Sequence, residues 1–225
     1  MTSDVFEPTA RTKVRRMPQR ANYEREIIFS ILDEGFICHL GLVTDGLPVV
    51  IATSYGRIGD HVFIHGSAAS RVAKVAKGTP SARIDVCLTV TLLDGLVLAR
   101  SAFNHSMNYR SVVLYGQASL VVDDEEKLES LRAVSDHIIK GRWDDVRPPT
   151  SQELKGTVVL KLPLTAASAK IRRGPPEDNE EDYALPIWAG VIPLDVRASV
   201  PIGDPQMDVS TAASVPDYVL NYRRP

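Results

Sequence analysis

The chain has 225 residues, of which 44% are hydrophobic and 24% charged, a composition typical of a globular protein that buries a sizeable core. Its formal net charge of −2 argues against nucleic-acid partners, which require a basic field. Neither the two cysteines, Cys38 and Cys87, nor the histidines show zinc spacing, so we expect buried thiols and no metal site. The sequence shows no signal segment and no run of about 20 apolar residues, so we expect a cytoplasmic protein without a membrane span.

The first part of the chain predicts one helix and three strands. Residues 1–20 are charged and irregular, and we expect them to form an N-terminal extension. Asn22 is suited to cap a helix, and Gly35 stands where a glycine would end it. The pairs Asp45-Gly46 and Gly59-Asp60 predict hairpin turns. The expected bounds are 23–34 for the helix and 36–44, 47–55 and 61–65 for the strands.

The next segment changes from a strand pattern to a helix pattern at Gly66. Ser67 is expected to cap this helix, and Ser70 to add a hydroxyl in its first turn. Arg71 can present a bidentate guanidinium, and Lys74 follows one turn later on the same face. Because a helix N-terminus attracts anions, the segment has two interpretations: a phosphate cradle, or an ordinary capped surface helix with two solvated cations.

The second half of the chain is rich in strands. A polar segment at 104–111 is expected to be a turn, and Asp123 with Glu126 forms a capping-box pattern before an amphipathic helix. We expect one main domain at 21–198 and an extended C-terminal tail at 199–225. The expected strands are 82–99 with a bend at Asp94-Gly95, then 112–122, 157–162, 166–173 and 187–196.

The order of elements is mainly β with inserted helices. Short hairpin connections join most of the strands, which favours a closed or nearly closed barrel over a parallel βαβ sheet. No GxGxxG motif follows a strand, so a dinucleotide-binding α/β fold is unsupported.

Four strings resemble one family when taken together. They are Thr-Ser-Tyr-Gly-Arg at 53–57, His-Gly-Ser-Ala-Ala-Ser-Arg at 65–71, Leu-Asp-Gly-Leu-Val-Leu-Ala-Arg-Ser at 93–101 and Asn-Tyr-Arg-Ser at 108–111. Over about 20–195 the chain is similar to the pyridoxamine 5′-phosphate oxidase-like family, in the branch related to nitroimidazole-resistance proteins. The resemblance implies an FMN-binding split β-barrel, and a homodimer with the flavin at its interface.

The resemblance also implies a set of cofactor contacts. Ser70 and Arg71 match the pair that holds the FMN phosphate, and Thr53 lies on the strand that borders the flavin ring. The further candidate contacts are Ser54, Tyr55, His65, Gly66, Ser67, Lys74, Asn108, Tyr109, Arg110, Ser111 and Trp188. The oxidase has lysines where this chain has Tyr55 and Val72, and its C-terminal arginine motif is not found here. We therefore do not expect authentic pyridoxamine-phosphate oxidation.

The expected function is that of an FMN-dependent oxidoreductase that passes electrons from NAD(P)H to a small acceptor. No Ser-His-Asp order or carboxylate pair indicates catalysis by the protein alone, so the cofactor would supply the redox chemistry. His105 is a candidate general acid, or else a hydrogen-bonded loop residue.

Three alternatives to this function stay open. The first is a flavin carrier or sensor without turnover. The second is a deazaflavin protein in which Lys74 and Lys77 bind the longer cofactor tail. The third is a haem protein, for which the candidate ligands are His39, His61, His65 and His105. Two further cations, Lys170 and Arg172, either approach a ligand or lie on a solvated face.

Overall fold

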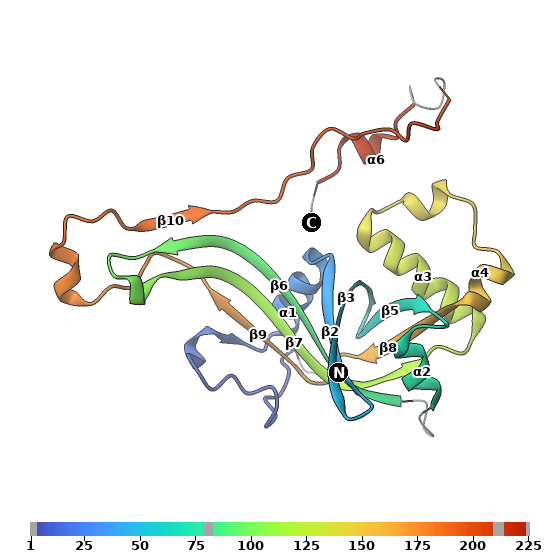
Figure 1. The fold of residues 1–225 in the computed structure, drawn as a ribbon, viewed down its shortest axis with the longest axis horizontal. Coiled ribbons are helices and arrows are strands. Elements are labelled where there is room, and N and C mark those ends of the chain that lie inside the picture. Colours follow the sequence, from blue (N-terminus) through green and yellow to red (C-terminus); the bar gives the residue numbers. More distant parts are fainter. Residues whose placement is uncertain (1–3, 79–82, 209–213, 224–225) are drawn as a thin grey trace.

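The computed structural model describes residues 4–78, 83–208 and 214–223. It is mainly β with a few helices, as predicted (Figure 1). The strands are β1 (Ala21–Asn22), β2 (Ile37–Thr44), β3 (Leu47–Ser54), β4 (Gly56–Ile58), β5 (His61–Ser67), β6 (Arg83–Leu98), β7 (Ser106–Leu120), β8 (Thr157–Pro163), β9 (Ala167–Arg172) and β10 (Gly190–Pro193). The α-helices are α1 (Arg25–Glu34), α2 (Arg71–Gly78), α3 (Asp124–Ile138), α4 (Ser151–Gly156) and α6 (Asp217–Leu220).

The sheet curls into a barrel. Its strand order is β3-β2-β6-β7-β8-β5-β4, with antiparallel pairing throughout. The two ends of this order, β3 and β4, are consecutive in the chain and are joined by Tyr55 alone. A single residue spans only about 3.5 Å, so the two edges of the sheet have to meet at Tyr55.

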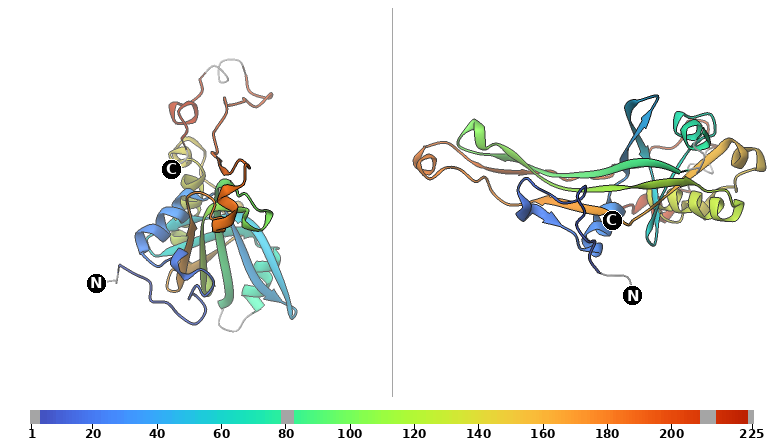
Figure 2. Two further views of the ribbon diagram at one scale, coloured as in Figure 1. Left: turned by 90° about the vertical axis from the view of Figure 1, so that its left-hand side faces the viewer. Right: turned by 90° about the horizontal axis from the view of Figure 1, so that it is seen from below.

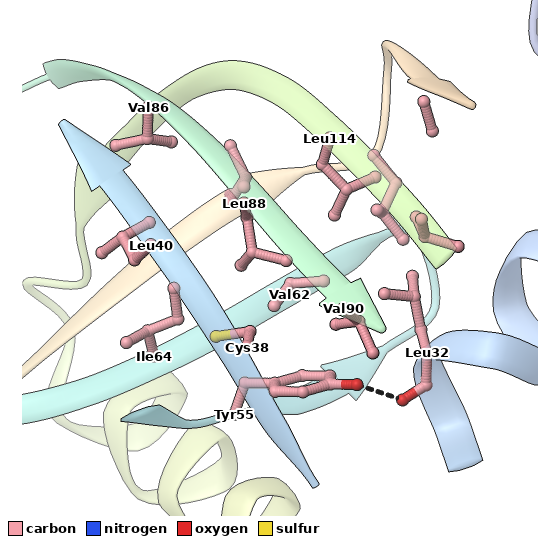
Figure 3. Close-up of a cluster of buried hydrophobic side chains, with 14 of the residues drawn as sticks. Leu32, Cys38, Leu40, Tyr55, Val62, Ile64, Val86, Leu88, Val90 and Leu114 are labelled. Carbon is pink, nitrogen blue, oxygen red and sulfur yellow. Dashed lines mark hydrogen bonds between the residues drawn. The ribbon is translucent and has the colours of Figure 1, made fainter. Parts of the chain in front are cut away.

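The interior of the barrel is apolar because side chains alternate along each strand. On β6, Val86, Leu88 and Val90 face inward, and they meet Leu114 of β7 (Figure 3). Tyr55 is fully buried among them and donates its hydroxyl to the carbonyl of Leu32 at the end of α1 (Figure 3).

The two longest strands leave the barrel and form an arm. β6 and β7 pair continuously from Arg83↔Ser119 to Val97↔Ser106, with a bulge between Leu93 and Gly95. We define the arm as residues 95–109 together with 173–193, which include β10 on the edge of β6. In Figures 1 and 2 the arm extends far beyond the barrel, at the end of the molecule opposite to α2.

Polar contacts fix the segment 173–189 along the arm. Asp178 is buried and forms an ion pair with Arg100. The guanidinium of Arg172 is also buried, and it donates to Asn108 and to the carbonyl of Pro175. The expectation of a solvated face at Arg172 is therefore wrong, because the loop that follows β9 folds back over this side chain.

Several element boundaries differ from the expected ones. The polar residues from Ser106 onward form the start of β7 rather than a turn, because Asn108 finds its partners in Arg172 and the carbonyl of Gly174. The last strand is only Gly190–Pro193, and α4, capped by Thr150, was not expected. Asp123 caps α3 as predicted, through a hydrogen bond from the amide of Glu126.

Both cysteines are free thiols. Cys38 is fully buried, and this burial raises its pKa to about 12, whereas Cys87 is partly exposed. The described helices include none with the length and apolar character needed to cross a membrane.

Close packing at Gly56 generates a first prediction. A Cβ added there would lie 2.6 Å from the backbone of Ala133 and Val134 in α3. Gly56→Ala is expected to lower the free energy of unfolding by about 1–3 kcal/mol, because α3 has to move outward. Urea denaturation measures this change, with Gly156→Ala as the control, because a Cβ at Gly156 meets nothing within 4 Å. Equal losses in the two variants would contradict the prediction.

His137 generates a prediction on pH. Its ring packs on Tyr55, with 4.6 Å between centroids, and its Nε2 contacts the carbonyl of Gly35. Burial lowers its pKa below the usual value of about 6.5. The unfolded chain therefore binds this proton at a higher pH than the folded chain does.

The free energy of unfolding should accordingly fall as the pH drops below about 6.5, until the folded-state pKa of His137 is passed. His137→Gln should reduce this pH dependence. Melting curves of both proteins between pH 7.5 and 5 measure it, and parallel curves would exclude His137 as the source.

Candidate functional site

A small cavity of about 180 Å³ opens where β3, β5 and β8 meet the start of α2. Its polar lining comes from Thr53, His65, Gly66 and Ser70. The rest of the lining is mostly apolar, from Leu40, Ile51, Ala52, Ile64, Val72, Val158 and Leu160. The structure thus brings Thr53 of β3 together with the residues that precede α2.

Ser70, and not Ser67, caps α2. The hydroxyl of Ser70 accepts from the amide of Ala73 at 3.2 Å, and the helix begins at Arg71. Ser67 instead accepts from the amide of Ala69 within the preceding turn. The predicted cap, Ser67, is three residues too early. Both serines have a hydroxyl that can accept a hydrogen bond from an amide two or three residues later in the chain, so the local sequence does not distinguish them. The N-terminal amides of α2 consequently lie beside the cavity.

Arg71 and Lys74 lie together on the exposed face of α2, as predicted. They line a second hollow, of about 430 Å³, with Thr44, Asp45 and Val75. In the described part of the chain, neither cation has a carboxylate within ion-pair distance. Two solvated cations beside a helix N-terminus favour the binding of an anion.

His65 has an unpartnered ring nitrogen. Its Nδ1 is buried and has no hydrogen-bond partner within the described residues, and His65 is one of the residues that line the cavity. A buried nitrogen without a partner carries a free-energy cost of about 1–3 kcal/mol. A ligand whose polar or metal atom reaches this nitrogen would remove this cost.

The residues after Thr53 turn away from the cavity. Tyr55 is a core side chain with its hydroxyl on Leu32, so its side chain does not contact a ligand in this cavity. Ser54 is partly buried opposite Ile37 and is not part of the cavity lining.

The candidates at 108–111 lie on the arm side of the molecule. Asn108 is held by Arg172, and Tyr109 pairs with the same residue across the sheet. Ser111 donates to the carbonyl of Lys170. None of these residues lines the cavity or the hollow beside Arg71.

Arg110 belongs to an ion-pair cluster that the sequence did not predict. Its guanidinium binds Glu34 at the end of α1 and Asp94 in the β6 bulge. These two carboxylates raise the pKa of Arg110 above its usual range. The three residues are far apart in the sequence, so no local pattern could have indicated the cluster.

His105 and Trp188 lie on the arm. His105 is exposed, with Nδ1 on the carbonyl of Ser101, and Trp188 is 68% exposed. Because α2 lies at the opposite end of the molecule, neither residue can reach the cavity of its own chain (Figure 1).

A family model described as pyridoxamine 5′-phosphate oxidase matches residues 24–171. The chain therefore belongs to the pyridoxamine 5′-phosphate oxidase family, and its barrel is the split barrel of that family. None of the curated proteins searched matches the sequence.

Two solved structures are similar over nearly the whole chain. The flavocytochrome Anf3 from Azotobacter vinelandii is 42% identical, with a TM-score of 0.88 over 97% of this chain and 99% of that one. The FAD and heme binding protein from Mycobacterium smegmatis is 34% identical, with a TM-score of 0.82 over 89% and 95%. A proposed 5-nitroimidazole antibiotic resistance protein from Bacteroides thetaiotaomicron, 22% identical with a TM-score of 0.56 over 67% and 86%, shares the fold.

The cluster around Arg110 generates a prediction on stability. Arg110→Gln leaves Glu34 and Asp94 without their shared cation and is expected to lower the free energy of unfolding by about 2 kcal/mol. Arg132→Gln is the control, because its ion pairs with Asp136 and Asp144 are exposed and should contribute about 0–1 kcal/mol. Urea denaturation measures both. Unchanged stability in Arg110→Gln would show that the cluster contributes little.

Proposed function

We propose that this protein is a redox protein that binds a flavin and haem. The observation that carries the proposal is that His65, which lines the cavity beside the N-terminus of α2, has a buried Nδ1 without a hydrogen-bond partner among the described residues. The two solved structures at 42% and 34% identity are named as a flavocytochrome and as an FAD and heme binding protein, which supports the same pair of cofactors here.

The flavin phosphate is assigned to the start of α2. The amides after Ser70 and the guanidinium of Arg71 supply charge-assisted donors, and Lys74 adds a second cation one turn later. The hollow beside Arg71 and Lys74 leaves space for a second phosphate, which FAD has and FMN lacks. We therefore favour FAD over FMN and over a deazaflavin.

His65 is assigned to the haem. Of the histidines proposed from the sequence, it combines a cavity with a ring nitrogen that lacks a partner, whereas His39 is exposed on β2 and His105 lies on the arm. An imidazole nitrogen free of other bonds is a common haem ligand. When bound, the two cofactors would supply electron transfer, and the chain would bind and orient them.

A second copy of the chain completes this site in the proposal. The cavity of about 180 Å³ is smaller than the roughly 300–1,000 Å³ of pockets that enclose ligands of this kind. The arm carries exposed apolar side chains that a partner could cover, and these are Phe103, Met107, Leu185, Ile187 and Trp188. A homodimer in which each arm reaches the partner's cavity would bring His105 and Trp188 to the cofactors.

The first experiment is a visible spectrum of the purified protein, followed by anaerobic addition of NADH or NADPH. Flavin bands together with a Soret band are expected, and mass spectrometry of the released cofactor distinguishes FAD from FMN. Bleaching of the flavin bands would show that NAD(P)H reduces the flavin and would support an oxidoreductase. A flavin that stays oxidised would favour a carrier or sensor, and a colourless protein that takes up neither cofactor would refute the proposal.

Arg71→Ala tests the phosphate assignment. Loss of a charge-assisted contact is expected to weaken flavin binding by about 2 kcal/mol, or about 30-fold. Lys155→Ala, an exposed cation on α4, is the control and should leave the affinity unchanged. Equal flavin affinity in Arg71→Ala and the parent protein would exclude Arg71 as a phosphate ligand.

His65→Ala tests the haem assignment. The Soret band is expected to disappear or shift while the flavin bands remain, because the substitution removes the proposed ligand nitrogen. His39→Ala is the matched control on an exposed strand position. An unchanged Soret band in His65→Ala would show that a residue other than His65 ligates the haem.

A further inference from the structure

A larger cavity lies on the outer face of the barrel, between the N-terminal segment and strands β5 to β8. It measures about 760 Å³, and we call it the outer groove. Its lining includes Arg11, His61, Arg83, Tyr115, Gln117 and Lys161. It shares no lining residue with the cavity at His65 or the hollow at Arg71.

Strand alternation explains why the outer groove is polar. On β7, Tyr115 and Gln117 alternate with the buried residues Leu114 and Ala118, so they face away from the core. Lys161 on β8 likewise stands between two buried leucines. Leu160, one of these leucines, lines the cavity at His65, whereas Lys161 lines the outer groove, so β8 contributes to the two sites from opposite faces.

Positive charge prevails in the outer groove. Arg11 and Arg83 are exposed, and within the described residues neither has a carboxylate at ion-pair distance. Lys161 is paired with Glu126, and Asp85, which is the carboxylate in the lining, accepts from Gln117. Arg11 and Arg83 thus lack a carboxylate partner in the part of the chain that the structure describes, although the whole chain has a formal charge of −2.

The N-terminal segment is built to hold Arg11 at this place. Thr9 and Thr12 close a turn around Arg11 through hydrogen bonds between their hydroxyls and amides. Thr12 is buried, and the hydroxyl of Tyr23 accepts from the amide of Val14 just after it. Ahead of the turn, Phe6 is 3% exposed and packs in the core.

Neutral donors and apolar surface complete the lining. Tyr115 presents its ring and hydroxyl, and Arg11 is close enough to oppose the rise in the Tyr115 pKa that burial causes. Gln117 and Thr165 add an amide and a hydroxyl, whereas Ala10, Pro163 and Ala166 add apolar surface. A few polar groups on a partly apolar wall are typical of small-molecule sites.

We propose that the outer groove binds a small organic anion, a phosphate ester or a carboxylate, whose acid group is taken by Arg11 and Arg83. The site is separate from the proposed flavin and haem site, so its ligand and those cofactors bind independently. A guanidinium is suited to both acid groups because its fork matches two oxygens at once.

The test is isothermal titration of the protein as purified with AMP and with citrate, using adenosine as the uncharged control. Binding of AMP, citrate or both is expected, with no binding of adenosine and weaker binding at high salt. The double variant Arg11→Gln/Arg83→Gln should bind the same probe at least about tenfold more weakly. Both side chains are exposed, so the melting temperature should stay within a few degrees of the parent value.

Further variants separate the outer groove from the flavin site. Thr165→Asp adds a negative charge to the lining and should abolish binding without altering either arginine. Arg71→Ala should leave binding of the probe unchanged, and Arg15→Gln, an exposed cation outside the lining, serves as the matched control.

Three binding results would overturn the proposal. They are the absence of binding by either probe, binding that survives Thr165→Asp and the double variant, and binding that is lost in Arg71→Ala. A change of oligomeric state in Arg11→Gln/Arg83→Gln would also overturn it, because it would identify the outer groove as a contact between subunits. None of these results depends on whether the flavin and haem assignments hold.

Discussion

The barrel depends on one buried corner, where Tyr55 joins the two ends of the strand order. Its hydroxyl holds the last turn of α1 through Leu32, and its ring packs against His137 of α3. Gly56 follows at once, and only a residue without a Cβ lets α3 approach its backbone. Sheet closure and the docking of two helices thus depend on consecutive residues. The apolar core adds stability around this corner, and the corner determines where the sheet edges meet.

Much of the barrel could be predicted from the sequence because local chemistry determined it. Asp45 and Gly46 both have positive φ, as the predicted hairpin turn requires, and Asp123 caps α3. The errors fall where distant residues decide the local structure. The polar start of β7 was predicted as a turn because its partner for Asn108, Arg172, is distant in the sequence. The two serines before α2 could not be distinguished as caps.

The predictions for the candidate site show the same contrast between local chemistry and distant partners. Thr53, His65, Gly66 and Ser70 meet at one cavity because short connections join their strands and the helix start, and the family resemblance pointed to all four. The motif at 108–111 predicted Arg110 as another contact of the same cofactor. In the structure its guanidinium binds Glu34 and Asp94 and does not line the cavity. Sequence motifs therefore indicated which segments meet at this cavity, whereas the partners of each charged side chain needed the structure.

The bulge in β6 has a consequence for how the arm and the barrel share one pair of strands. Up to Leu92 the buried residues of β6 have even numbers, whereas between Gly95 and the end of the strand the buried residues are Gly95 and Val97. One extra residue, Asp94, therefore reverses the alternation, while β7 continues without a break. The same residue supplies a carboxylate to Arg110, so the inserted position is itself held in an ion pair. A relative without a residue equivalent to Asp94 would turn the opposite face of its β6 strand outward along the arm. The number of residues at this point is therefore a structural signature of the arm.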